Sequence, residues 1–238
     1  MNSDGTDQPI VIGRSTAGWL GSMVATVFIG AIALGMLIVA VLVLLNGAQL
    51  GILFLVVAVI LGILFANLLR DTRGKTGWRI VIGTDALDLD LPLGRSLIHR
   101  LDAVHAPIRF DEIEAIETRL EAYPGLFGLT DMHRSYGLKL KTGAVIILGE
   151  DRALHTTFES SLLEGAVRQI VGRSRLELRD LGMAEGRDGL LGVLFAAPPP
   201  WDAPSLSAER QGELWAAAER TGSLALGAIF VSLFNRPK

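Results

Sequence analysis

The sequence predicts an α+β membrane protein in which a helical hairpin precedes a β domain with a closing helix. Three observations lead to this prediction. The mean hydropathy is +0.44, and no charged residue lies between Ser15 and Leu69 in the 238-residue chain. Residues 78–185 then contain short segments of alternating apolar and polar residues, as in half-buried strands. An apolar stripe at helical spacing ends that region.

Composition excludes several classes of protein. The formal net charge is −3, which disfavours a protein that binds nucleic acid through phosphate neutralisation. The chain has no cysteine, so a disulfide scaffold, a zinc site with cysteine ligands and a thiol nucleophile are excluded. We therefore expect no nucleic-acid partner.

The uncharged run predicts two transmembrane helices. Asn46-Gly47-Ala48-Gln49 is its one polar, turn-prone cluster, and Asn-Gly is a strong turn signal. The cluster divides the run into spans at residues 19–45 and 50–69, and about 20 apolar residues suffice to cross a bilayer. A cleaved signal peptide ending near Ala31-Ile32-Ala33 is the alternative, but the apolar stretch continues well beyond it. We expect an uncleaved hairpin over residues 19–70, with its turn near 46–49.

The basic residues predict the orientation of this hairpin. Its turn has no Lys or Arg, whereas the segment after the second span carries Arg70, Arg73, Lys75 and Arg79. By the positive-inside rule, the N-terminal tail (1–18) and everything after the hairpin are cytoplasmic. Residues 71–77 read as a basic juxtamembrane linker, and these four cations are the candidate contacts to anionic lipid.

Residues 78–185 read as a β domain. Strand patterns occur at 79–82, 87–91, 116–121, 136–140 and 144–148, with Lys141-Thr142-Gly143 as the turn of a hairpin. Residues 111–123 also fit one helical face, and we favour a short helical turn at 111–113 that leads into a strand. Ser161-Leu162-Leu163-Glu164 has the form of a capping box. It opens a helix whose apolar stripe runs to Val171, with Gly172 near its end.

This order of elements resembles bacterial membrane proteins with a pleckstrin-homology-like domain. The residues that carry the resemblance are 78–91 (an opening hairpin), 108–116 (a short turn leading into a middle strand), 137–148 (a hairpin) and 158–171 (a capping helix). The resemblance implies an antiparallel β-barrel or sandwich capped by a helix, in a two-pass protein of the bacterial inner membrane. It implies scaffolding or assembly roles and no enzymatic activity.

Sequence patterns for catalysis are weak. The acidic stretch Asp111, Glu112, Glu114, Glu117 and Glu121 would allow a carboxylate pair for acid–base chemistry, but the solvated face of a strand explains it better. The four histidines are His99, His105, His133 and His155, and their spacing is that of scattered loop residues rather than metal ligands. We expect no catalytic residue, metal or cofactor.

Two apolar segments are candidate contacts with the membrane or a partner. The loop Tyr123–Leu129 combines a Pro-Gly turn signal with the apolar side chains of Tyr123, Leu126, Phe127 and Leu129. The alternative is that this loop folds back on its own core. After a proline-rich linker at 186–206, residues 207–238 read as a helix followed by an apolar interfacial segment, with Trp215, Phe230 and Phe234 as candidate contacts.

These features together predict a non-enzymatic scaffold or assembly factor of the inner membrane. Its cytoplasmic domain would bind a membrane protein partner or a second copy of the chain. A module that binds lipid or a small ligand at the cytoplasmic leaflet is the alternative, based on the juxtamembrane cations and the 123–129 loop.

Overall fold

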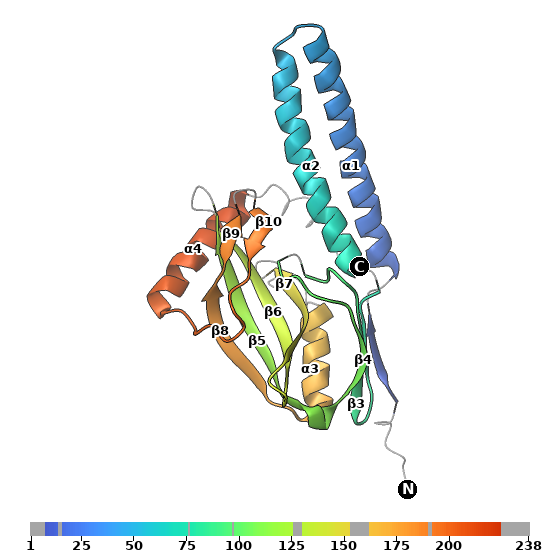
Figure 1. Cartoon of the computed structure of the whole chain (residues 1–238), viewed down its shortest axis with the longest axis vertical. Coiled ribbons are helices and arrows are strands. Elements are labelled where there is room, and N and C mark those ends of the chain that lie inside the picture. Colours follow the sequence, from blue (N-terminus) through green and yellow to red (C-terminus); the bar gives the residue numbers. More distant parts are fainter. Residues whose placement is uncertain are drawn as a thin grey trace.

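The computed structural model describes residues 8–13, 16–75, 77–96, 98–125, 130–152, 162–189 and 192–224. Its helices and sheets confirm the predicted α+β class. Helices α1 (Thr16–Leu45) and α2 (Leu50–Lys75) lie side by side and project from a domain of strands and shorter helices (Figure 1). Residues 46–49 connect them, and Gly47 takes the left-handed φ of +76° that such a turn requires. Helix α2 continues to Lys75, so the predicted linker is helical over most of its length.

Small residues bring α1 and α2 together. A Cβ placed on Gly30 would lie 2.7 Å from the ring of Phe65, so glycine permits the close approach. The hydroxyl oxygens of Thr26 and Thr72 are 3.2 Å apart in a buried hydrogen bond between the helices. Ala33, Ala40 and Ala58 are also buried. Among the described side chains, these small residues therefore serve the packing of one helix on the other.

The first sheet joins the N-terminal segment to the residues after α2. Its order is β1-β2-β3-β4 and all its pairs are antiparallel, with β1 (Ile10–Gly13), β2 (Arg79–Ile82), β3 (Ala86–Leu91) and β4 (Val104–Arg109). Strand β1 pairs with β2 from Ile10 opposite Ile82 to Gly13 opposite Arg79. The segment expected to be an N-terminal tail thus contributes an edge strand to the domain.

The second sheet has the order β7-β6-β5-β8, with β5 (Ile113–Pro124), β6 (Thr130–Leu140), β7 (Val145–Arg152) and β8 (Leu178–Glu185). A 3₁₀ turn at Phe110–Glu112 leads into β5, which is the alternative that the sequence favoured. Strand β8 runs parallel to β5, so the expectation of a wholly antiparallel domain was wrong. The reason is helix α3 (Leu162–Ser174), which carries the chain back before β8 begins.

Helix α3 and both sheets share one apolar core. Leu163, Ala166, Val167 and Ile170 of α3 pack against strand residues that include Ile80, Leu89, Ile116 and Leu138. The two sheets form no closed barrel within the described residues. Helix α3 ends at Ser174, two residues beyond Gly172, in agreement with the predicted end near the glycine, and the left-handed residue after it is Arg175 at φ +58°. The predicted N-cap, Ser161, lies outside the described residues.

The C-terminal part of the chain folds onto the second sheet. Strands β9 (Arg187–Gly189) and β10 (Gly192–Ala197) pair with each other, and residues 198–207, the strap, lead to helix α4 (Ala208–Leu224). Leu214 and Ala218 of α4 pack against Leu120, Met132 and Met183. The proline-rich region, predicted to be a stiff linker, is bound to the domain at Pro199, Pro200 and Leu206.

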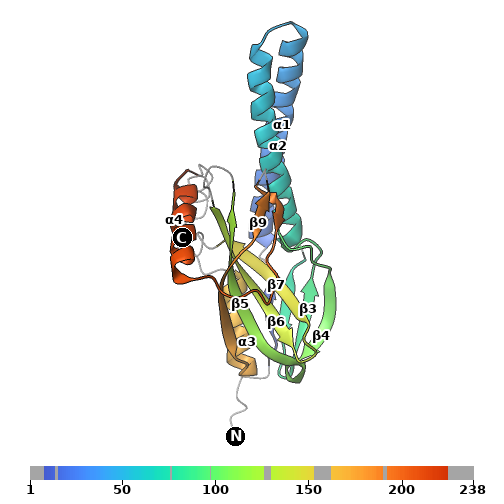
Figure 2. The ribbon, with the colours of Figure 1, turned by 60° about the vertical axis from the view of Figure 1, so that its left-hand side comes forward.

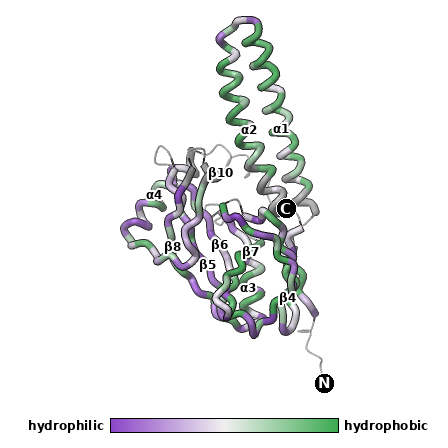
Figure 3. Tube along the Cα trace, in the orientation of Figure 1, coloured by the Kyte–Doolittle hydropathy of each residue, from purple (hydrophilic) through white to green (hydrophobic). Residues whose placement is uncertain are grey.

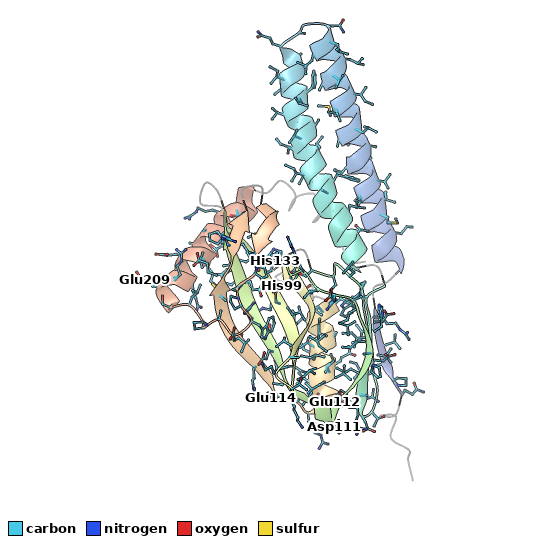
Figure 4. All side chains as sticks on the ribbon, in the orientation of Figure 1. His99, Asp111, Glu112, Glu114, His133 and Glu209 are labelled. Carbon is cyan, nitrogen blue, oxygen red and sulfur yellow. The ribbon has the colours of Figure 1, made fainter. Side chains whose placement is uncertain are left out.

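The molecule is elongated, with α1 and α2 at one end and the domain at the other. A turn of the view by 60° preserves this division (Figure 2). The labelled His99 and His133 lie in the half of the domain nearer to α1 and α2, whereas Asp111, Glu112 and Glu114 lie at the far end (Figure 4). The acidic turn is therefore the part of the domain most distant from the apolar helices.

Candidate functional site

Apolar residues make up most of the described length of α1 and α2 (Figure 3), and many of their side chains are exposed, so that they form an extended apolar surface. Leu34, Leu42 and Leu53 each expose more than half of their surface, and many neighbouring side chains do the same. Within the described residues, one helical segment is long and apolar enough to cross a membrane, Met23–Leu45. The apolar segment of α2, Leu50–Ala66, is shorter. A surface of this kind needs an apolar environment, because soluble proteins rarely expose contiguous apolar patches above a few hundred Å².

The domain is attached to the base of both helices. Strand β1 ends just before α1, and β2 begins just after α2. The pairing of β1 with β2 therefore holds the two helix ends together through a hydrogen-bonded ladder. The guanidinium of Arg173 on α3 reinforces this pairing by donating to the backbone carbonyls of Gln8 at 2.8 Å and Ile82 at 3.4 Å.

A buried polar face lies on β5 and β6 beneath the strap. Alternation along β5 places Glu117, Arg119 and Glu121 on one face, and the antiparallel register sets Gly137, Ser135 and His133 of β6 opposite them. The polar side chains among these six are all buried. The sequence favoured a solvated face for this acidic stretch, and for Glu117 and Glu121 that interpretation was wrong, because the strap and residues near His99 cover the face.

Arg119 is the centre of this face. Its side chain is fully buried, and its guanidinium donates to Oε1 of Glu121 from Nη2 at 2.7 Å and from Nε at 3.0 Å. The same guanidinium donates to the carbonyl oxygen of Pro199 at 3.0 Å and also to that of Pro200. Four hydrogen bonds thus satisfy a charge whose burial would otherwise be strongly unfavourable.

Glu121 is held as a carboxylate by its neighbours. Burial alone would raise the pKa of Glu121, but hydrogen bonds from His99 Nε2 at 2.9 Å and from the Tyr123 hydroxyl, together with the charge of Arg119, lower it to about 2. Burial and the Glu121 carboxylate raise the pKa of Tyr123, which keeps its proton. The polar face is therefore a fixed ion pair with a neutral tyrosine donor, suited to holding a bound segment in place.

The lowered pKa predicts a contribution of Glu121 to stability that depends on pH. The ordinary pKa is 4.5 and the folded pKa is about 2, so the contribution is complete above pH 4.5 and is lost as the pH falls from 4.5 to 2. We expect a loss of about 3 kcal/mol over that window. Urea unfolding at a series of pH values measures the free energy of unfolding of wild type and of Glu121→Gln. The difference between the two values should become smaller below pH 4.5. Parallel pH profiles for the two proteins would contradict this expectation.

Trp201 anchors the strap beside Arg119. Its indole Nε1 donates to Oε2 of Glu117 at 2.6 Å, and the guanidinium carbon of Arg119 lies 4.7 Å from the centroid of the Trp201 ring, in cation–π contact. The ring lies against Gly137, where an added Cβ would come within 2.8 Å of it. Two carbonyls and one indole of the strap are thus bound by three residues of the sheet.

His133 and Ser135 complete the polar face. His133 packs edge-on against Tyr123, with ring centroids 5.8 Å apart. Its Nε2 lies 3.4 Å from Oδ2 of Asp131, and neither this nitrogen nor Oγ of Ser135 has a hydrogen-bond partner among the described residues. No group of three or more histidine and carboxylate side chains in this part of the chain is arranged to hold a metal ion.

The structure places the predicted contact residues in different settings. Tyr123 is fully buried, so its predicted role as a surface contact gives way to a role in the polar face. Trp215 on α4 has 36% of its surface exposed and stays a candidate contact. The remaining predicted contacts of this kind lie outside the described residues: Leu126, Phe127, Leu129, Phe230 and Phe234.

The four juxtamembrane cations divide between α2 and β2. Arg70, Arg73 and Lys75 lie in the last turns of α2, and Arg79 opens β2. Arg79 shares a shallow surface depression of about 270 Å³ with Asp88, Asp90 and His105, and the histidine Nδ1 lies 2.7 Å from Oδ1 of Asp90. Two carboxylates in this depression disfavour an anionic phosphate at Arg79.

Sequence reasoning missed the buried polar face as a binding surface. The missed residues are Glu117, Arg119, Gly137 and Trp201, and they come from two strands and the strap. One available signal was the arginine between two glutamates on a strand with otherwise clean alternation. A second was the tryptophan directly after three prolines.

Comparisons with protein-family models, curated proteins and solved structures find no match to the chain.

Proposed function

We propose that the chain is a non-enzymatic scaffold or assembly factor of the bacterial inner membrane. In this proposal α1 and α2 both cross the bilayer, and a pleckstrin-homology-like cytoplasmic domain binds a protein partner. The observation that carries the proposal is the exposed apolar surface of α1 and α2, joined at its base to a polar folded domain by the β1–β2 ladder. Lipid is the environment that such a surface requires.

The base of the helix pair supports a two-pass topology with the domain in the cytoplasm. Because β1 and β2 are paired, the chain enters α1 and leaves α2 on the same side. Arg70, Arg73 and Lys75 lie at that end of α2, where the positive-inside rule places cytoplasmic cations. The acidic turn at Phe110–Glu112 lies at the opposite end of the domain (Figure 4), away from the anionic leaflet.

Helix α4 supports binding of a protein partner. One side of α4 is fixed to the sheet by Leu214 and Ala218, and Thr221 Oγ1 accepts a 2.7 Å hydrogen bond from the backbone N–H of Thr130. Trp215 is on the same helix, with 36% of its surface exposed. A large aromatic side chain on a firmly held helix is a typical anchor for a partner.

Site-specific photocrosslinking in intact membranes tests this function. A photoreactive phenylalanine analogue replaces Trp215 in one variant and Thr142, in the exposed β6–β7 turn, in the matched control. We expect one stoichiometric membrane-protein adduct from position 215 and none from position 142. Recovery of the chain with lipid adducts alone would contradict the scaffold and favour the alternative, a module that binds lipid or a small ligand at the leaflet.

A further inference from the structure

The strap has an outer part around Pro200 and Trp201 and an inner part, in which Pro199 is buried and Leu206 packs against the core. Pro200 is exposed and Trp201 is half-buried, while Arg119 beneath them is fully buried. Prolines have no backbone N–H, so the run 198–200 donates nothing to the sheet and is bound through its carbonyls. Residues 199–201 are bound to β5 by Arg119, which donates to two carbonyls, and by Glu117, which accepts from the Trp201 indole. The end of the strap is held separately on β8, where Leu206 N–H donates to the Met183 carbonyl at 2.8 Å and Met183 N–H donates to Ser205 Oγ at 3.2 Å.

Four residues of the sheet contact the strap or fix the residue that does: Glu117, Arg119, Glu121 and Gly137. We name the site that they form the strap groove. Arg119 is fixed by Glu121 so that two of its N–H groups point at successive carbonyls. Glu117 accepts one N–H donor, and Gly137 leaves room for a flat ring, which a Cβ at that position would obstruct. Together these features favour a peptide segment with two adjacent carbonyl acceptors, proline in place of residues that carry an N–H, and a tryptophan directly after them.

We propose that the strap groove is a receptor for proline-rich segments of a partner protein, and that the chain's own strap occupies it as a resident ligand. Proline-rich peptides suit such a role because their extended conformation is preformed and carries little ordering cost. A partner segment with prolines followed by tryptophan would replace residues 199–201, while Ser205 and Leu206 keep the end of the strap on β8. This inference rests on the proposed scaffold function, for which it names the class of partner.

Direct peptide binding tests the proposal. The probe is a fluorescent peptide with the sequence of residues 196–203, Ala-Ala-Pro-Pro-Pro-Trp-Asp-Ala, added to the full chain in lipid nanodiscs. In wild type the tethered strap competes, whereas Trp201→Ala weakens the resident ligand. We expect the peptide to bind Trp201→Ala at least tenfold more tightly than wild type, measured by fluorescence anisotropy. Replacing the peptide's tryptophan with alanine should weaken binding at least tenfold.

Two further variants test the groove itself without removing the buried ion pair. In the Trp201→Ala background, Glu117→Leu removes the acceptor of the indole. Gly137→Ala places a Cβ where the ring lies and also 2.9 Å from Cγ1 of Val145, whose side chain must shift slightly. Each should weaken peptide binding at least tenfold and leave the circular dichroism spectrum unchanged. Equal binding to wild type and Trp201→Ala, or equal binding of the two peptides, would overturn the proposal.

Two controls separate this inference from the scaffold function. Vesicle flotation of Trp201→Ala measures membrane integration independently of peptide binding. If the chain floats with the vesicles but does not bind the peptide, the proposed peptide receptor is wrong and the membrane scaffold is unaffected. A chain that does not float overturns the membrane scaffold. If Trp201→Ala forms dimers and does not bind the peptide, the groove binds a second copy of the chain, and the proposal that it binds a partner protein is wrong.

Discussion

Replacing Glu121 with leucine will destabilise the domain by about 3–5 kcal/mol, because the change leaves the charge of Arg119 buried without its partner. The side chains of Arg119 and Glu121 are both fully buried, and Nη2 of Arg119 lies 2.7 Å from Oε1 of Glu121. Urea unfolding of the purified chain in detergent, followed by tryptophan fluorescence, measures the loss. The double variant Arg119→Met with Glu121→Leu removes both charges, so it should be more stable than Glu121→Leu alone.

An exposed ion pair provides the matched control for this change. Glu114 lies on the same strand as Glu121 and pairs with Arg179 at 2.9 Å, but both side chains are well exposed. Glu114→Gln should therefore cost at most about 1 kcal/mol. A double variant no more stable than Glu121→Leu alone, or a loss at Glu114 as large as that at Glu121, would contradict the role given to the buried pair.

Two arginines in the middle of α1 will prevent its insertion into the membrane. Leu34 and Ile38 both expose more than half of their surface and lie within Met23–Leu45. Each arginine near the centre of a spanning helix costs about 2.5–3.5 kcal/mol in insertion. We expect the double variant Leu34→Arg with Ile38→Arg to lose most of its carbonate-resistant membrane fraction.

The matched control places the same two charges on equally exposed apolar residues outside the helices. Val11 on β1 is 57% exposed, and Leu93 after β3 is 69% exposed. The variant Val11→Arg with Leu93→Arg should remain in the membrane fraction like wild type. Equal extraction of both double variants would show that general destabilisation, rather than loss of a spanning helix, explains the result.

Local signals predicted much of the fold. The Asn-Gly cluster placed the break between the two helices at residues 46–49, and the helices end at Leu45 and begin again at Leu50. The turn at 141–143 is present, with Gly143 at φ +89°. Such features depend on neighbours in sequence, which is why pattern alone finds them.

The polar face was missed because its burial is a long-range effect. Alternation correctly put Glu117, Arg119 and Glu121 on one side of β5, but a solvated strand face has the same pattern. The cover comes from Pro199 and Pro200, about 80 positions away in the chain. Strand β1 was missed for a related reason, since the triplet Ile10-Val11-Ile12 is too short to indicate a strand until β2 is available to pair with it.

Labelling of single cysteines tests the proposed two-pass anchor most directly, and the natural chain is suited to it because it contains no cysteine. Gln49→Cys marks the connection between α1 and α2, and Thr142→Cys marks the exposed β6–β7 turn. A membrane-impermeant maleimide is applied to spheroplasts and to inverted inner-membrane vesicles. We expect Gln49→Cys to react only in spheroplasts and Thr142→Cys only in inverted vesicles. Reaction of both cysteines from the same side would contradict a hairpin that crosses the membrane twice.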